Sequence, residues 1–402
     1  MDHLARLQQC TLSAATSSCS QGGRKRGFRK QPLMLPQLGG KDEQHSHPSF
    51  EQSKGLRIVT STLNNGRRGF MASSVSALAG LSVGQLLSPS AWAAETSAGG
   101  GSVGEFTNLK SVDAGDLRVS YVDVGPANGP VVVLLHGWPY DIHAFYDVAP
   151  KLVVAGYRVI VPSLRGYGGT RFLSADTPRN AQQAAVAQDI ISLMDALKIQ
   201  HAVVGAFDWG ARTACIMAAL WPERIKGIVS VSGYLIGNPK NNAKSGPPAA
   251  EFAWWYQSYL LTDRGRDGYA AQTAAFNRFI WQQASPLWKF DDATYERSAK
   301  SFDNPDHVAI VVHNYRWRTG VAPGEARFDA IEARLAALPL ISVPTITMEG
   351  DSNGAPHPNP SAYAAKFTGK YKHRQLGAPI GHNLPQEAPE AFAQAVIDVT
   401  RL

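Results

Sequence analysis

The sequence predicts a doubly wound α/β fold, with a mostly parallel sheet and a helical cap inserted between the two halves of the core. Short apolar runs alternate with stretches of helical periodicity, as expected when helices connect parallel strands. The run at 131–135 is apolar throughout, which is typical of a central strand buried on both faces. Between Gly233 and about Leu340 the alternation stops and aromatic residues accumulate. An insertion of about 100 residues is too long for a simple loop, so we expect a helical cap.

The charge of the chain is concentrated near its N-terminus. The 402 residues carry a formal net charge of +7, and residues 1–93 hold 11 of the 39 Lys and Arg but 4 of the 32 Asp and Glu. The remainder has 28 of each kind, which gives no reason to expect a nucleic-acid partner. Only one of the three cysteines, Cys215, lies in this remainder, which excludes an intramolecular disulfide there.

Residues 1–94 are predicted to be a disordered basic leader that ends in an export signal. Arg67 and Arg68 precede a mildly apolar run at 72–87, and Ala91-Trp92-Ala93 fits a small–x–small cleavage site. This order resembles a twin-arginine signal. We therefore expect export to the periplasm, or targeting to an organelle of the thylakoid-lumen type as the alternative. No stable membrane span is expected, because glycines and serines interrupt a run shorter than about 20 apolar residues.

The rest of the chain divides into four predicted parts. They are a Gly/Ser linker at 95–104, a first half of the core at 105–235, the cap at 236–340 and a second half of the core at 341–402. Strands are expected at 117–124, 131–135, 157–161, 202–207, 228–231 and 344–348, with a helix at 181–197. In such sheets the active site lies at the carboxyl ends of the strands.

The stretch at 202–212 predicts a strand that turns sharply into a helix, with Asp208 at the apex. Small residues flank the apex at Ala206, Gly210 and Ala211. They are needed because strand and helix pass too close together for larger side chains. The turn therefore presents Asp208 as a candidate carboxylate nucleophile.

This turn resembles the nucleophile elbow of the α/β-hydrolases, and two further motifs fit that family in the expected chain order. His136-Gly137-Trp138-Pro139 resembles the loop that supplies a backbone N–H to the oxyanion hole. Gly381-His382-Asn383 precedes the last helix, where the family has its general base. The resemblance covers roughly residues 105–402. It implies that Asp208 is the nucleophile, His382 the base, and the N–H groups of Trp138 and Trp209 the oxyanion donors.

The acid that should orient His382 has three candidates. In the family it follows the strand expected at 344–348, where this chain reads Glu349-Gly350-Asp351-Ser352-Asn353. The family position holds Asn353. We predict that Asp351 takes the role through a locally shifted loop, with Asn353 and Glu349 as alternatives. The other position known in the family, after the strand at 228–231, offers no carboxylate.

Two tyrosines of the expected cap indicate the reaction. Tyr256-Gln257-Ser258-Tyr259 and Asn314-Tyr315-Arg316 resemble the segments that carry the cap tyrosines of epoxide hydrolases. Phenols with a pKa near 10 can protonate the oxygen of an opening epoxide ring.

The resemblance implies an epoxide hydrolase that acts on a small apolar epoxide through a covalent ester on Asp208. The alternatives are a haloalkane or haloacid dehalogenase that uses the same ester on a halogenated substrate, and a non-catalytic ligand-binding protein. No cofactor and no metal are expected, since the histidines lack ligand spacing such as His-Glu-x-x-His.

Overall fold

The computed structural model describes residues 106–355 and 357–402. The predicted leader, the export signal and the linker lie outside these residues and stay predictions. Within the described residues no helix is both long enough and apolar enough to cross a membrane.

The described residues form a nine-stranded sheet in the order β1-β2-β4-β3-β6-β7-β8-β9, with β5 paired to β2. Neighbours from β4 to β9 are parallel, whereas β2 is antiparallel to all its neighbours. The doubly wound, mostly parallel sheet is therefore confirmed. The strands are β1 (Lys110–Ala114), β2 (Leu117–Val124), β3 (Val131–Leu135), β4 (Arg158–Pro162), β5 (Arg171–Phe172), β6 (Ala202–Ala206), β7 (Ile225–Val231), β8 (Thr345–Gly350) and β9 (Tyr371–Leu376).

The register of the central strands places two loops side by side. Strands β3 and β6 are parallel neighbours, and Leu135 lies opposite Ala206 near their carboxyl ends. The loops that leave these strands therefore start from the same edge of the sheet. Strands β7 and β8 are likewise parallel, with Val231 opposite Met348. All four ends face the region expected to hold the site.

The strands that sequence patterns did not reveal lie at the edges. Strand β9 reads Tyr-Lys-His-Arg-Gln-Leu, and each of its side chains is half-buried or exposed. An edge strand of this kind has no apolar run, because only part of its surface meets the core. Its pairing with β8 nevertheless matters for the site, because it sets the direction in which the chain leaves β8.

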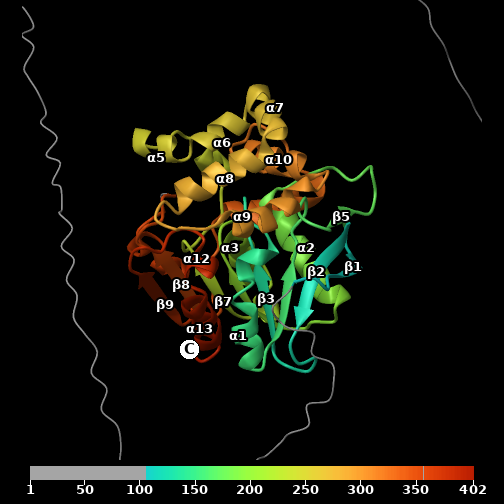
Figure 1. Ribbon diagram of the computed structural model, residues 1–402, viewed down its shortest axis with the longest axis vertical. Coiled ribbons are helices and arrows are strands. Elements are labelled where there is room, and N and C mark those ends of the chain that lie inside the picture. The colour runs from blue at the N-terminus through green and yellow to red at the C-terminus, as the bar shows by residue number, and fades with distance from the viewer. Residues whose placement is uncertain (1–105, 356) are drawn as a thin grey trace, which may run out of the picture. The chain divides into compact units, whose positions relative to one another are not determined.

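Helices of the core cover both faces of the sheet. Helix α1 packs against α13, and α2 packs against α3 on the opposite face (Figure 1). These helices are α1 (Ala149–Val154), α2 (Gln183–Ala196), α3 (Trp209–Leu220), α12 (Leu384–Glu387) and α13 (Pro389–Val399).

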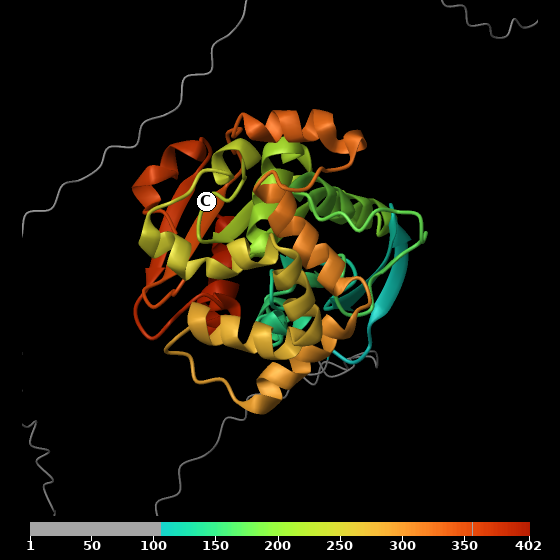
Figure 2. The ribbon, with the colours of Figure 1, turned by 90° about the horizontal axis from the view of Figure 1, so that it is seen from above.

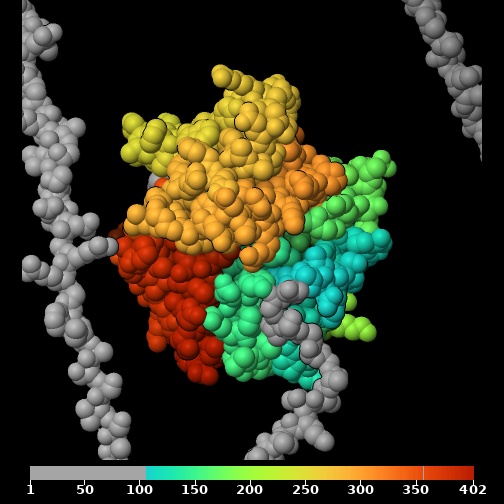
Figure 3. Space-filling model, in the orientation of Figure 1, coloured from blue at the N-terminus to red at the C-terminus, as the bar shows by residue number. Residues whose placement is uncertain are grey.

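A helical cap connects β7 to β8 and lies over the carboxyl ends of the strands (Figure 1). From above, its helices cross the middle of the sheet (Figure 2), and the space-filling view shows them as a continuous block on the core (Figure 3). The cap helices are α4 (Pro239–Asn242), α5 (Pro248–Ala253), α6 (Trp255–Leu260), α7 (Asp263–Ala271), α8 (Thr273–Ala284), α9 (Asp292–Ala299), α10 (His307–Arg318) and α11 (Asp329–Ala336).

Buried hydrogen bonds attach the cap to the loop after β3. The Trp281 indole of α8 donates to the Pro139 carbonyl at 2.7 Å. The Trp138 indole donates to the Tyr269 hydroxyl of α7 at 3.0 Å. Because these polar groups are buried, the loss of either partner would leave the other unsatisfied. The cap is thus fixed in position over the edge of the sheet where β3 and β6 end.

Candidate active site

Asp208 lies at the apex of a tight turn between β6 and α3. Its backbone has φ 52° and ψ −125°, a left-handed region that residues other than glycine rarely adopt. Two glycines permit the turn. A Cβ on Gly210 would lie 2.1 Å from the Leu135 carbonyl oxygen, and one on Gly137 would lie 2.3 Å from the Asp208 Cβ. The structure therefore contains the sharp strand-to-helix turn that the small residues predict.

The loop after β3 donates a hydrogen bond to the Asp208 carboxylate. The backbone N–H of Trp138 lies 2.8 Å from Asp208 Oδ1. Trp209, the other predicted donor, is the first residue of α3, and the first N–H groups of a helix have no partner within it. The Trp209 ring is buried against Tyr167 and Tyr315. One carboxylate oxygen is thus held by a backbone donor, as an oxyanion hole requires.

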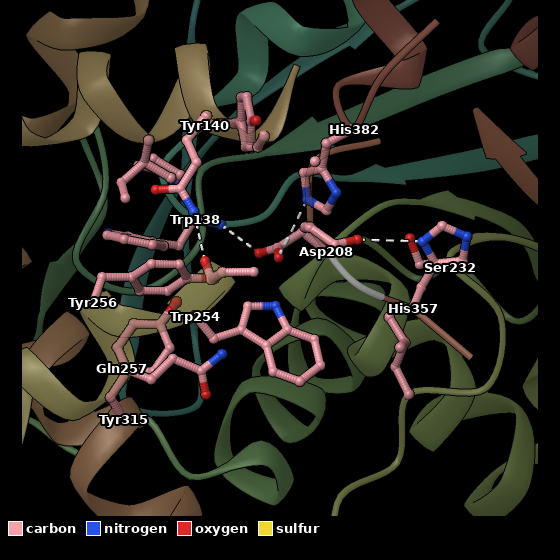
Figure 4. Close-up of a pocket in the computed structure, with 18 of the residues that line it drawn as sticks. Trp138, Tyr140, Asp208, Ser232, Trp254, Tyr256, Gln257, Tyr315, His357 and His382 are labelled. Atoms are coloured by element: carbon pink, nitrogen blue, oxygen red, sulfur yellow. Dashed lines mark hydrogen bonds and ion pairs between the residues drawn. The ribbon is translucent and has the colours of Figure 1, made fainter. Parts of the chain in front are cut away.

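His382 faces the second oxygen of the same carboxylate. Its Nε2 lies 3.6 Å from Asp208 Oδ2, and Figure 4 shows Asp208 between Trp138 and His382. The His382 N–H donates to Ser285 Oγ at 2.9 Å, at the end of cap helix α8. The Glu387 carboxylate accepts hydrogen bonds from the backbone N–H groups of the two residues that flank His382, Gly381 and Asn383, at 2.7 and 3.0 Å.

His382 was predicted from the sequence, but the two residues that hold its loop, Glu387 and Ser285, were not. Glu387 reaches back to an N–H at the start of helix α12, much as the acidic residue of a capping box does. That signal was present in the sequence. Ser285 comes from a distant part of the chain, and no local pattern indicates its contact with His382.

The charges of Asp208 and His382 are linked. Burial alone would raise the pKa of the Asp208 carboxyl, but His382 and Arg212 lower it below its usual value. Burial alone would lower the pKa of the His382 imidazole, but Asp208, with smaller contributions from Glu349 and others, raises it above its usual value. Asp208 is therefore ionised at neutral pH, and its charge favours the protonated form of His382.

Asp351 lies away from this pair. Its side chain is exposed, and its Oδ1 accepts a hydrogen bond from Gln375 Nε2 on β9 at 2.6 Å. Its backbone N–H donates to the Leu376 carbonyl, which continues the pairing of β8 with β9. Because this pairing turns Asp351 toward the edge of the sheet, the structure does not bring it to His382.

The two alternative residues lie together on the inner side of the same turn. Glu349 is buried in β8, and its Oε1 accepts from Asn353 Nδ2 at 2.7 Å. Its Oε2 lies 3.4 Å from Nε2 of His357, which lines the cavity above Asp208. Glu349 Oε2 and His382 Nδ1 are both buried, and neither has a hydrogen-bond partner among the described residues. His357 was not predicted from the sequence.

Tyr256 and Tyr315 face the same cavity as Asp208. Their rings lie 5.1 and 5.3 Å from the Trp138 ring and 5.7 Å from each other, measured between centroids. Burial, with a contribution from Asp208, raises the pKa of Tyr256 to about 12, and burial also raises the pKa of Tyr315 above its usual value. Both phenols therefore carry their protons at neutral pH.

The cavity has a volume of about 170 Å³ and lies between the cap and the ends of the strands (Figure 4). Besides the residues above, its lining includes polar side chains from both core and cap. Within the described residues there is no group of three His, Cys, Asp or Glu side chains arranged to hold a metal ion. The polar residues of the lining include Arg212, Ser232, Gln257, Gln283 and Arg318.

Known proteins share the sequence pattern and the fold of this chain. The sequence profile of the family described as "alpha/beta hydrolase fold" matches residues 130–320. A crystal structure from Klebsiella pneumoniae, of a protein proposed to be an epoxide hydrolase, is 59% identical, with a TM-score of 0.74. The match covers 75% of this chain and 100% of that one.

Two further relatives differ in their reactions. A haloalkane dehalogenase of Mycobacterium marinum is 29% identical over 222 residues, which are 53% of this chain and 71% of that protein. Epoxide hydrolase B of Mycobacterium tuberculosis is 32% identical over 149 residues, which are 34% of this chain and 41% of that protein.

Proposed function

The chain belongs to the α/β-hydrolase family, and we propose that it hydrolyses epoxides to diols through a covalent ester on Asp208. One observation carries the proposal: an ionised carboxylate at the elbow shares its cavity with two neutral phenols. A carboxylate can attack a ring carbon while a phenol protonates the ring oxygen. The similarity to the Klebsiella and Mycobacterium tuberculosis proteins supports the same reaction.

In the first step, Asp208 Oδ2 attacks a ring carbon of the epoxide. This oxygen is free to react, because the Trp138 N–H holds Oδ1. The C–O bond of the ring breaks, its electron pair moves to the ring oxygen, and Tyr256 or Tyr315 donates a proton. The products of this step are an alkyl ester on Asp208 and a hydroxyl group on the neighbouring carbon.

In the second step, His382 removes a proton from water and the hydroxide adds to the ester carbonyl. The negative oxygen that forms accepts hydrogen bonds from the N–H groups of Trp138 and Trp209, each worth roughly 3 kcal/mol in sites of this kind. The intermediate then collapses: the departing diol oxygen takes the proton of the hydroxyl group that water supplied, and the Asp208 carboxylate is restored. A proton from His382 regenerates the phenol that donated in the first step. Ester formation removes the charge on Asp208 that raises the pKa of His382. His382 therefore becomes a free base at the stage that needs one.

Glu349 is the residue that we assign to orient His382. Its carboxylate is buried at the end of β8, has one oxygen without a hydrogen bond, and raises the pKa of His382. A carboxylate that accepts from Nδ1 of a catalytic histidine fixes the ring and leaves Nε2 to act as the base. Asn353 in turn holds the other oxygen of Glu349. Asp351, exposed on the other side of the turn, has no part in this assignment.

A dehalogenase would use the same nucleophile but would need N–H donors for the departing halide. The Trp138 indole is already hydrogen-bonded to Tyr269. The Trp209 indole N–H has no hydrogen-bond partner among the described residues, but Trp209 is not among the residues that line the cavity. Two phenols that face the nucleophile suit an epoxide oxygen better. A non-catalytic ligand-binding role would leave the strained turn at Asp208 without a purpose.

The test is mass spectrometry of the His382→Gln variant after incubation with a panel of small epoxides. We expect the wild type to release diol, and the variant to gain the mass of one epoxide on the peptide that contains Asp208. Release of chloride from chloroalkanes without epoxide turnover would establish a dehalogenase instead. Binding of ligands with neither reaction would favour the non-catalytic role.

A further inference from the structure

Two guanidinium groups line the cavity that holds Asp208. Arg212 lies one turn into α3, four residues after the nucleophile, and Arg318 is the last residue of cap helix α10. Both side chains are half-buried. One comes from the core and the other from the cap, so the two line one cavity only because the cap lies over the elbow.

Neither guanidinium has a carboxylate partner within 4 Å in residues 106–355 and 357–402. Arg212 donates one hydrogen bond, from Nε to the Leu235 carbonyl at 3.2 Å, which leaves its NH₂ groups available. Two other arginines of the described residues are neutralised: Arg165 pairs with Asp189 through two hydrogen bonds, and Arg316 pairs with Asp263. Arg318 lies over the Tyr315 ring, 5.8 Å from its centroid, but this contact supplies no counter-ion. A partly buried cation without a counter-ion is costly, so the position of the two arginines calls for an explanation.

The charges of the two arginines oppose each other. Burial, followed by the charge of Arg318, lowers the pKa of Arg212 to about 10. Arg212 is still charged at neutral pH, but its charge is opposed by burial and by Arg318. Asp208 is the carboxylate whose charge raises the pKa of Arg212, and it loses that charge when the ester forms. An anion that enters with the substrate would offset both positive charges throughout the reaction.

We propose that Arg212 and Arg318 together bind a carboxylate carried by the substrate, which makes the substrate an oxirane carboxylate. This inference rests on the proposed function and replaces the apolar epoxide that the sequence led us to expect. A guanidinium presents a planar fork of N–H groups that matches the two oxygens of a carboxylate. Two such groups also offset the repulsion between the substrate carboxylate and Asp208. The cavity of about 170 Å³ accommodates a small molecule of this class.

The test compares two substrates of nearly equal shape, glycidate and its neutral amide, glycidamide. Water converts glycidate to glycerate by the steps given above. We expect the wild type to show a kcat/KM for glycidate about 100-fold above that for glycidamide, as a paired charge in a buried site allows. Arg318→Met keeps the aliphatic stem and removes the charge, so it should lower this ratio at least about tenfold, mainly through KM.

Two further variants distinguish the loss of carboxylate binding from a general loss of structure. Arg318→Lys keeps the charge without the fork and should retain part of the preference. Arg316→Met removes one positive charge from the same helix, but Arg316 points to Asp263 and does not line the cavity. It should therefore leave the glycidate-to-glycidamide ratio unchanged. Equal loss of the ratio in the Arg316 and Arg318 variants would overturn the proposal.

Calorimetric binding of glycerate separates this inference from the proposed function. Binding that weakens about tenfold or more in Arg318→Met, without turnover of any epoxide, would support the carboxylate site and reject the epoxide hydrolase. Equal turnover of glycidate and glycidamide, without glycerate binding, would reject the carboxylate site and retain the hydrolase. Absence of both turnover and binding would overturn both.

Discussion

The turn after β6 and the turn after β8 both bring a carboxylate to the carboxyl edge of the sheet, but different forces shape them. Close packing of the chain fixes the first: a Cβ on Gly210 would collide with the backbone of Leu135, and one on Gly137 would collide with the Asp208 side chain. Side-chain hydrogen bonds and pairing with β9 determine the second, where Glu349 points inward to Asn353 and Asp351 faces outward. Close approach of two backbone segments requires small residues, which form a visible pattern in the sequence. No such pattern shows which of two nearby carboxylates points inward.

The largest effect is expected at the turn after β6. Asp208→Asn keeps an oxygen for the Trp138 N–H but replaces the nucleophile with an amide. We expect diol formation to fall by at least about 10⁴-fold, as removal of a catalytic nucleophile does in other hydrolases. Chromatographic assay of the diol measures the loss, and an unchanged melting temperature shows that the fold persists. Activity above a tenth of the wild type would rule out the covalent mechanism.

The second effect tests the turn after β8. Glu349→Gln should slow hydrolysis of the ester about 100-fold, since the orienting acid of a catalytic triad contributes 10²-fold or more. The negative charge of Glu349 raises the pKa of His382, so its removal lowers that pKa. Because the neutral imidazole is the base, the acidic limb of the rate profile should also move to lower pH. Single-turnover rates as a function of pH provide the measurement.

Two results of that experiment would contradict the assignment of Glu349. An unchanged rate would show that Glu349 has no part in catalysis. A slower rate with an unchanged pH profile would indicate a loss of local structure without any effect on the charge of His382.

Much of the fold and of the site was predictable from the sequence. The contacts that were not predictable have one physical cause in common. The strand at 131–135, the elbow at Asp208 and the loop of His382 each depend on neighbours in the chain, so local patterns indicated them. The contact of Ser285 with the His382 loop and the presence of Arg212 and Arg318 in one cavity depend on how the cap is placed on the core. The spacing of residues in the sequence does not predict how the cap is placed on the core.

The third effect involves the cap and leaves both turns intact. Tyr256→Phe and Tyr315→Phe each remove a proton donor from the cavity while they preserve the ring packing around Trp138. We expect each change to slow formation of the ester about tenfold, because one phenol can partly replace the other, and the double change to slow it at least about 100-fold. Tyr259→Phe is the matched control, since this tyrosine of α6 stacks on Phe276 and does not line the cavity. Stopped-flow measurement of the intrinsic fluorescence follows ester formation. A double variant as fast as the control would remove the phenols from the mechanism.

The smallest effect returns to the turn after β8. Asp351→Asn should change kcat/KM by less than about twofold and the free energy of unfolding by no more than about 0.5 kcal/mol, as is usual for surface substitutions. The side chain is exposed, and an asparagine there keeps the oxygen that accepts from Gln375. Glu349→Gln is the matched comparison for Asp351→Asn. Each change turns a carboxylate into its amide, and the two positions are two residues apart. A 100-fold loss in the Asp351 variant, with a shifted pH profile, would show that the loop moves during catalysis and that Asp351 orients His382 after all. A loss confined to the Glu349 variant would establish that the buried side of the turn supplies the acid.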